Sequence, residues 1–408
     1  MLKICRRIGI CAFALISFVQ GAVADVDSES LVENNSTFAF DLYKKLSPAE
    51  GNLFFSPYSI SSALAMTYAG ARGDTAKQMA SVLNFKSQGE KGAEADLHSG
   101  FAALQKELAA AAGDGNVTFE VANSLWPQKG HEFLNGYLSL LKQNYDVVVT
   151  ALDYAAALEE ARLKINTWVE EKTHNKIREL IKPGVLTALT RMVLINAVYF
   201  KGKWEFPFEK SKTKEAPFYV SAEKQVPVQM MFGNEHLGYA EDDGLQILEI
   251  PYAGGRFSMM VLLPKERDGL REIEKRLSAD NLARWRRLLG PEKVQVSLPK
   301  FSLTSEFRLE KELSEMGIKD AFDVSKADFS GMDGERWLYI DSALHKAWLE
   351  VSEEGAEAAA ATGMVMVGRS AVILPKFKAD HPFIFLIQEK PSGAVLFLGR
   401  FSDPSPKK

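Results

Sequence analysis

The sequence predicts an α+β protein that folds as one large domain. Segments with helical apolar spacing dominate the first half of its 408 residues, whereas segments rich in Val, Ile, Phe and Tyr dominate the second half. Because helices and strands do not alternate regularly, a doubly wound parallel sheet is not expected. No internal repeat, Pro-rich linker or block of charge divides the chain, and 46% apolar residues are enough for one continuous core.

Helices are expected mainly before residue 175. At Ser56–Pro57 a proline stands in a first-turn position, where its missing N–H costs nothing, and an interior rich in Ala, Leu and Met follows. Three further segments carry apolar residues at helical spacing. The expected helices span residues 57–69, 74–83, 96–111 and 157–174.

The expected strands combine β-branched and aromatic residues with turn residues at both ends. They span residues 116–125, 191–200, 245–251, 257–263, 294–303 and 395–401. Most of them follow residue 240, so the second half of the chain is expected to supply most of the sheet structure.

The first 24 residues have the pattern of a signal peptide. Lys3, Arg6 and Arg7 precede an apolar run over residues 8–19, and Ala22-Val23-Ala24 has the small-x-small pattern that places the expected cleavage point after Ala24. The apolar run is shorter than the roughly 20 residues that span a bilayer, so no membrane anchor is expected. We therefore expect residues 1–24 to be removed and residues 25–408 to be secreted as a single domain, into the extracellular space or a periplasm.

The charge and cysteine content exclude several classes of function. The chain has 49 Lys and Arg against 53 Asp and Glu, a formal net charge of -4, so neither nucleic acid nor an anionic membrane is expected as a partner. Both cysteines, Cys5 and Cys11, lie in the predicted signal peptide. A mature chain without cysteine has no disulfides, no thiol chemistry and no Cys-ligated zinc.

An enzyme is not indicated by any motif. The chain lacks the G-x-S-x-G, H-E-x-x-H, Walker A and G-x-G-x-x-G patterns, and none of its six histidines lies at metal-ligand spacing from another. We expect no catalytic residues, no bound metal and no cofactor.

A basic cluster lies at Arg284, Arg286 and Arg287. A solvated face of an amphipathic helix is the usual explanation for such a run. A weak polyanion site near these three residues is the alternative.

The segment from Glu353 to Leu374 has conflicting local preferences. Its alanine run favours a helix, but Gly355, Gly363 and Gly368 interrupt the run, and the β-branched second half favours extended structure. Such a conflict is expected where a segment must adopt more than one conformation. A surface helix followed by a strand is the alternative.

Five long stretches of the chain resemble the serpin family, in order and over essentially all of residues 30–404. They are residues 52–79, 190–208, 296–301, 345–363 and 379–404. The resemblance implies an α+β serpin fold of three β-sheets and about nine helices, with an exposed reactive-centre loop at about 354–375. It also implies an inhibitor of serine proteases rather than an enzyme.

In an inhibitory serpin, a protease cleaves this loop and is trapped as a covalent acyl-enzyme when the cut loop inserts as a strand into a β-sheet. An inserting strand must carry small or apolar side chains at every second position. The inward set would begin Ala356, Ala358, Ala360 and Thr362, without proline or charge. The hinge implied by the resemblance comprises Glu354, Gly355, Ala356, Glu357, Ala358, Ala359, Ala360, Ala361 and Thr362.

The family pattern also implies the cleaved bond. The attacked residue is the seventeenth from the first hinge glutamate, and counting from Glu353 reaches Arg369, so Arg369–Ser370 is the expected bond. Val367 and Gly368 make the preceding sequence similar to antithrombin. Arginine at this position suits trypsin-like serine proteases, whose specificity pocket holds a carboxylate. We expect a monomer that forms a covalent acyl complex with such a protease. The alternative is a non-inhibitory serpin (carrier, chaperone or storage protein) that is cleaved as a simple substrate.

Two polar groups carry over from the family by motif. Trp204, Lys300 and Glu353 resemble the breach, where the loop enters the sheet. A second group resembles the shutter, which controls opening of the central strands: Ser56, Ser59, Asn196 and His345. Ordinary buried polar structure is the alternative for both.

Overall fold

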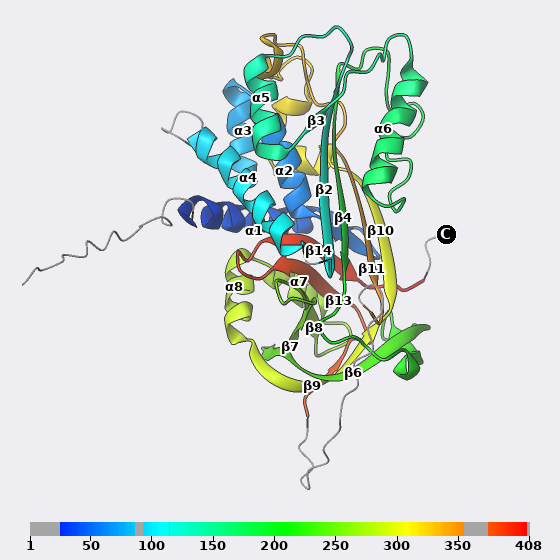
Figure 1. The fold of residues 1–408 in the computed structure, drawn as a ribbon. Helices are drawn as coiled ribbons and strands as arrows, with labels where there is room; N and C mark the ends of the chain where they lie inside the picture. The colour runs from blue at the N-terminus through cyan, green and yellow to red at the C-terminus, as the bar shows by residue number, and fades with distance from the viewer. Residues whose placement is uncertain (1–24, 86–92, 114, 355–373, 406–408) are drawn as a thin grey trace, which may run out of the picture.

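The computed structural model describes residues 25–85, 93–113, 115–354 and 374–405 (Figure 1). Within these ranges ten α-helices surround two hydrogen-bonded β-sheets, which confirms the predicted α+β class. Among the described residues, no helix combines the length and the apolarity that crossing a membrane would require.

The smaller sheet has five strands in the order β10–β11–β4–β2–β3. β10 pairs with β11, and β2 with β4, as antiparallel ladders along almost their whole lengths. The central pair β11 and β4 is parallel and is joined by only two register pairs, Ala347 with Val198 and Trp348 with Tyr199. The strands are β2 (Val117–Pro127), β3 (Val148–Val149), β4 (Met192–Gly202), β10 (Phe301–Arg308) and β11 (Leu344–Val351).

The larger sheet has nine strands in the order β1–β14–β13–β8–β7–β6–β9–β12, with β5 on the free side of β6. β6 is long enough to pair with β5, β9 and β7 at successive parts of its length. The described strands therefore form two hydrogen-bonded sheets, where the resemblance implies three. Its strands are β1 (Leu53–Phe55), β5 (Lys214–Tyr219), β6 (Gln225–Asp242), β7 (Leu245–Pro251), β8 (Phe257–Pro264), β9 (Gly290–Pro299), β12 (Lys376–Lys378), β13 (Phe383–Glu389) and β14 (Val395–Phe401).

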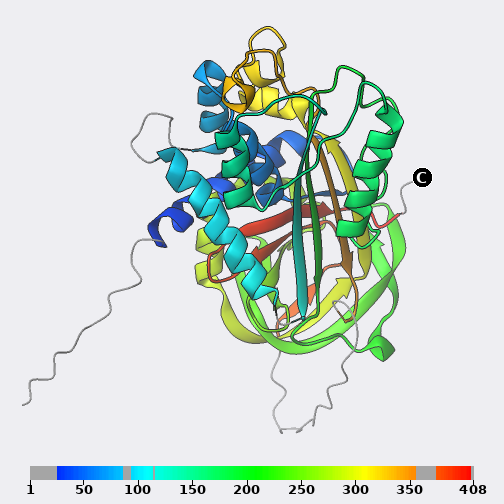
Figure 2. The same cartoon turned by 45° about the horizontal axis from the view of Figure 1, so that its top comes forward.

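Helices cover the two faces of the five-stranded sheet unequally. α2 to α5 lie on one side of β2 and β4, and α6 lies alone on the other, as both views show (Figures 1 and 2). The helices are α1 (Asp25–Leu46), α2 (Pro57–Tyr68), α3 (Gly73–Leu83), α4 (Ala93–Ala111), α5 (Asn135–Tyr145), α6 (Leu158–Lys172), α7 (Leu270–Arg276), α8 (Ala279–Leu288), α9 (Glu310–Met316) and α10 (Ser330–Asp333).

α2 packs at the centre of the molecule. Its first turn is fixed by Pro57 and by the Ser56 hydroxyl, which accepts a hydrogen bond from the Ser59 N–H. All but one of its residues are buried, so tertiary packing rather than helix propensity stabilises it. It contacts β4 and β14, and therefore joins the two sheets.

A second, smaller core lies between α6 and the outer face of the five-stranded sheet. There Tyr199 on β4 stacks on Trp348 on β11, with ring centroids 5.9 Å apart and planes 4° from parallel. Lys176 places its ammonium 4.3 Å from the centre of the Trp348 ring. These contacts cover the short ladder between β4 and β11 from outside.

One expected strand is corrected. Residues 294–303 are not one strand but the end of β9 and the start of β10, which belong to different sheets. Lys300 stands between the two strands, and its N–H donates to the carbonyl of Gln229. Both halves have the same alternating pattern, so the sequence did not show that the chain changes partners at this point.

Candidate functional site

The junction between β4 and β11 is the candidate site. β11 ends at Val351 in the five-stranded sheet, and the chain is described again from residue 374, just before β12 in the nine-stranded sheet. The predicted bond Arg369–Ser370, the specificity residues Val367 and Gly368, and the hinge from Gly355 to Thr362 lie outside the described residues. Of the predicted hinge, only Glu354 is described.

The structure brings the three predicted breach residues together at the end of β11. Lys300 Nζ lies 2.7 Å from Glu353 Oε2, and the Glu353 side chain is almost fully buried. Burial raises the pKa of this carboxyl, but the hydrogen bond from Lys300 and the other polar contacts outweigh it, so the net pKa is lowered. Trp204 Nε1 donates to the carbonyl of Ser352 at 2.9 Å.

The segment that begins at Trp204 also holds the backbone beyond β11. The Trp204 N–H donates to the Glu354 carbonyl at 3.1 Å, and the Phe208 N–H donates to the Glu353 carbonyl at 2.8 Å. Lys210 forms an ion pair with the Glu354 carboxylate. The Trp204 ring is itself fixed by stacking on Tyr252 at 4.5 Å. Any movement of residues 353–354 must therefore break several hydrogen bonds at once.

The four predicted shutter residues form two separate hydrogen-bonded groups. The His345 Nε2 accepts the Ser56 N–H at 3.0 Å, which ties β11 to the start of α2. The Ser56 hydroxyl donates to the Leu396 carbonyl of β14 at 2.6 Å and also accepts from the Ser59 N–H. This group fixes β11 to the helical side of the molecule.

Asn196 belongs to the other group. Its Nδ2 donates to Asn123 Oδ1 on β2 at 2.7 Å, so it binds within its own half of the sheet and not to His345. The buried Asn196 Oδ1 and Ser59 Oγ have no hydrogen-bond partner among the described residues. The two halves of the sheet are consequently not joined by the shutter side chains.

Burial lowers the pKa of His345 to about 3, so its ring is neutral at ordinary pH. Since Nε2 accepts the Ser56 N–H, the neutral ring carries its proton on Nδ1.

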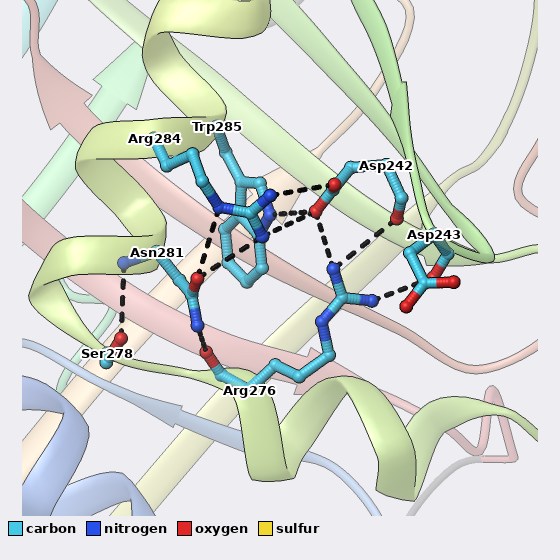
Figure 3. A network of polar contacts seen from close by, with 7 residues as sticks. All are labelled: Asp242, Asp243, Arg276, Ser278, Asn281, Arg284 and Trp285. Atoms are coloured by element: carbon cyan, nitrogen blue, oxygen red, sulfur yellow. Dashed lines mark hydrogen bonds and ion pairs between the residues drawn. The ribbon is translucent and has the colours of Figure 1, made fainter.

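The predicted polyanion cluster is mostly engaged inside the protein (Figure 3). Arg284 makes two hydrogen bonds to the Asp242 carboxylate, at 2.9 and 2.8 Å, and Arg276 and the Trp285 indole N–H bind the same group. Burial raises the pKa of Asp242, but these donors outweigh it and the net pKa is lowered.

Arg286 is also committed internally, to Gln388 Oε1 and the Gly393 carbonyl. Burial lowers the pKa of its guanidinium to about 10. Arg287 is exposed, and the Arg284 side chain is 43% exposed although it is bonded to Asp242. This arrangement does not favour a polyanion site.

No group of three His, Cys, Asp or Glu side chains in the described ranges is placed to hold a metal ion.

The sequence reasoning missed the partners that hold these residues. Asn123, Phe208, Lys210 and Tyr252 were not singled out. The run from Lys201 to Lys210 carries a local signal for two of them, because its aromatic residues at alternate positions, Trp204, Phe206 and Phe208, need packing partners.

Comparisons with known proteins support the resemblance. The family model described as "Serpin (serine protease inhibitor)" matches residues 33–404. Serpin B6 of Pongo abelii is 44% identical over 379 residues, which covers 92% of this chain and 99% of that protein. Leukocyte elastase inhibitor of Bos taurus is 42% identical over 387 residues, at 92% and 100% coverage. Among solved structures, uncleaved ovalbumin matches with a TM-score of 0.81 and 33% identity, covering 92% of this chain and all of that one.

These comparisons correct the predicted localisation. The Serpin B6 and leukocyte elastase inhibitor relatives are intracellular serpins of clade B, so the assignment of this protein to the extracellular space or a periplasm is wrong. That assignment depended on the composition of residues 1–24, which lie outside the described residues. A short apolar run behind basic residues is a local pattern, and it does not by itself fix where a folded domain resides.

Proposed function

The chain belongs to the serpin family of protease inhibitors, and we propose that it inhibits trypsin-like serine proteases as a suicide substrate. The protease serine oxygen would bond to the carbonyl carbon of Arg369, and the Arg369–Ser370 amide would break as the Ser370 amine takes up a proton and leaves. Insertion of the cut segment between β4 and β11 would trap the acyl-enzyme before water hydrolyses the ester. This scheme needs one copy of the chain and no cofactor.

The short parallel ladder between β4 and β11 is the observation that carries the proposal. The ladders on either side of it, β10–β11 and β2–β4, are long and antiparallel, whereas the β4–β11 ladder in the middle of the sheet holds only two register pairs, as few as the ladder of the short edge strand β3. A segment that turns back after Glu354 would run antiparallel to both central strands. Inserted there, it would complete an antiparallel arrangement on either side.

The energies favour insertion. Opening the junction breaks two register pairs and the stack of Tyr199 on Trp348, which together amount to a few kcal/mol. A new strand of the predicted length would add about ten backbone hydrogen bonds at roughly 1 kcal/mol net each, before any side-chain burial. The uncut protein would then be metastable, because a kinetic barrier, to which the contacts at the end of β11 contribute, would prevent insertion before cleavage.

The hinge composition supports an inhibitor over a simple substrate. Ala356, Ala358, Ala360 and Thr362 are small enough to enter a sheet core at alternate positions. Arg369 supports the trypsin-like class, because a buried guanidinium needs a carboxylate partner in the protease pocket.

The test is to mix the protein with trypsin in near-equal amounts and to follow the products by denaturing gel electrophoresis and intact mass. We expect a denaturant-stable adduct together with a released peptide that begins at Ser370. Cleavage at Arg369 without an adduct would favour the non-inhibitory alternative, and no cleavage would overturn the assignment of the loop.

A variant separates trapping from recognition. Ala358→Pro places a residue without an N–H on the inward face of the inserting strand, so the variant should be cleaved as fast as the parent without forming the adduct. Retained trapping by this variant would contradict the insertion mechanism.

A further inference from the structure

A cavity of about 670 Å³ lies beside the β4–β11 junction. It is bounded by β4, by the start of β11, by α2 and by the segment that precedes β11. Its volume is within the range of sites that hold small molecules. Apolar side chains make up much of its wall: Ile60, Leu64, Leu309, Leu313, Met332 and Leu344.

The mouth of the cavity is apolar and aromatic. Leu189, Val324, Trp337 and Tyr339 line the cavity and are all exposed, Leu189 to 77%, so they mark where it opens to solvent. Large exposed apolar side chains gathered around an opening are typical of a binding site rather than of an inert surface. An occupant that fits both the wall and the mouth must therefore be largely apolar.

One cation lines this opening. Arg191, the residue before β4, lines the cavity, and its guanidinium lies over the Trp337 ring, 5.6 Å from the ring centre. Its Nη1 donates to the carbonyls of Ala188 and Thr190, both at 3.2 Å. Its Nε and Nη2 donate to no described residue, and no described carboxylate forms an ion pair with it.

The two unused nitrogens of Arg191 select the chemistry of a ligand. Nε–H and Nη2–H lie on the same edge of the planar guanidinium and form a fork that matches the two oxygens of a carboxylate. The bonds of Nη1 to the two backbone carbonyls and the Trp337 ring restrict the orientation of this fork. A carboxylate is therefore the group that would use the unpaired edge best.

Asp341 is a carboxylate that also lines the cavity, but it is exposed and forms no ion pair with Arg191. Its charge would weaken the attraction of the mouth for an anion. The effect should be modest, because water and salt screen the interaction between exposed charges that are not in contact.

We propose that this cavity binds a medium-chain aliphatic carboxylate. The carboxylate would accept two parallel hydrogen bonds from Arg191 Nε and Nη2 at the mouth, where it keeps part of its hydration. The alkyl chain would lie against the apolar wall. A cationic headgroup on the same chain would be repelled by Arg191, and a short carboxylate would bury too little apolar surface to bind.

Calorimetric titration of the whole protein with decanoate at pH 8 tests the site. We expect saturable binding of one molecule. Decyltrimethylammonium has the same alkyl chain and the opposite charge, so it should bind roughly tenfold more weakly, the effect of losing a hydrogen-bonded charge pair. Butyrate keeps the carboxylate but not the chain, and should give no measurable binding.

Variants locate the two parts of the ligand. Arg191→Gln removes the cation and should weaken decanoate binding roughly tenfold. The control is Arg271→Gln, at an exposed position on α7 outside the cavity wall, which should leave binding unchanged. Ala63→Phe fills the cavity from α2 without removing a charge and should prevent binding. A thermal melt of each variant checks that it is folded.

Three results would overturn the proposal. They are no binding of decanoate, equal binding of decyltrimethylammonium by the parent protein, and undiminished binding of decanoate by folded Arg191→Gln or folded Ala63→Phe. Each can be measured without any protease, so failure of the proposed inhibitory function would not affect the outcome.

Discussion

Lowering the pH from 8 to 5 should destabilise the protein, and His345 should account for a defined part of the loss. Burial lowers the pKa of His345 to about 3 in the folded state, whereas an unfolded histidine titrates near its ordinary value of 6.5. Above pH 6.5 neither state holds the proton. Below pH 6.5 only the unfolded state takes it up, so stability falls steadily until the pH reaches the folded pKa.

The expected magnitude follows from these two values. At pH 5 the unfolded histidine is about 1.5 pH units below its pKa, which amounts to roughly 2 kcal/mol of lost stability. His98 should contribute a similar amount, because burial lowers its pKa to about 4. With an unfolding entropy of about 2.1 cal/mol/K per residue, 408 residues convert each 2 kcal/mol into a shift of about 2 °C.

The assay is the midpoint of the first thermal transition at pH 8 and pH 5, for the parent and for His345→Gln. The glutamine carbonyl can accept the Ser56 N–H but does not titrate, so the variant should lose about 2 °C less than the parent over this range. The pH is kept at 5 or above so that most carboxylates stay ionised and the change in stability reports mainly on histidines. An identical loss in the two proteins would show that His345 can be protonated inside the fold, and would refute the reasoning.

Three further changes should have measurable effects. Arg369→Leu should abolish trypsin inhibition and allow inhibition of chymotrypsin-like proteases, measured by residual protease activity; unchanged trypsin inhibition would show that another bond is attacked. Glu353→Gln should lower the free energy of unfolding by about 1 kcal/mol, less than a fully buried charged hydrogen bond contributes, because Lys300 is partly exposed. The control is Glu350→Gln, at an exposed position on β11, which should leave the melting midpoint unchanged. Equal midpoints for the two variants would mean that the breach contact adds no stability. Asp242→Asn should lower the melting midpoint by a few degrees, because it removes the negative charge that Arg276 and Arg284 share. The control is Asp243→Asn, since the Asp243 side chain is exposed. Equal effects of the two substitutions would contradict a stabilising role for the network in Figure 3.

Elements with strong local signals were predicted closely. The strands at 245–251 and 395–401 are β7 and β14 with identical bounds, and the helix expected at 57–69 is α2 to within one residue. In each case the boundary is set by nearby residues, such as the proline and capping serine before α2. The shift of partners at Lys300 was not predicted, because it depends on strands far away in the chain.

The α+β class, the family and the small-residue pattern after Glu354 could all be predicted from the sequence, because propensity, periodicity and motifs are local properties of the chain. Which polar groups contact one another could not be predicted, because it depends on the folded arrangement of distant segments. Ser56 and His345 are 289 positions apart, Asp242 and Arg284 are 42 apart, and both contacts depend on how separate elements pack. The short ladder between β4 and β11 is likewise a property of the whole sheet. Hydrogen bonds, ion pairs and buried pKa shifts act over a few ångströms in space, and only the folded chain fixes those distances.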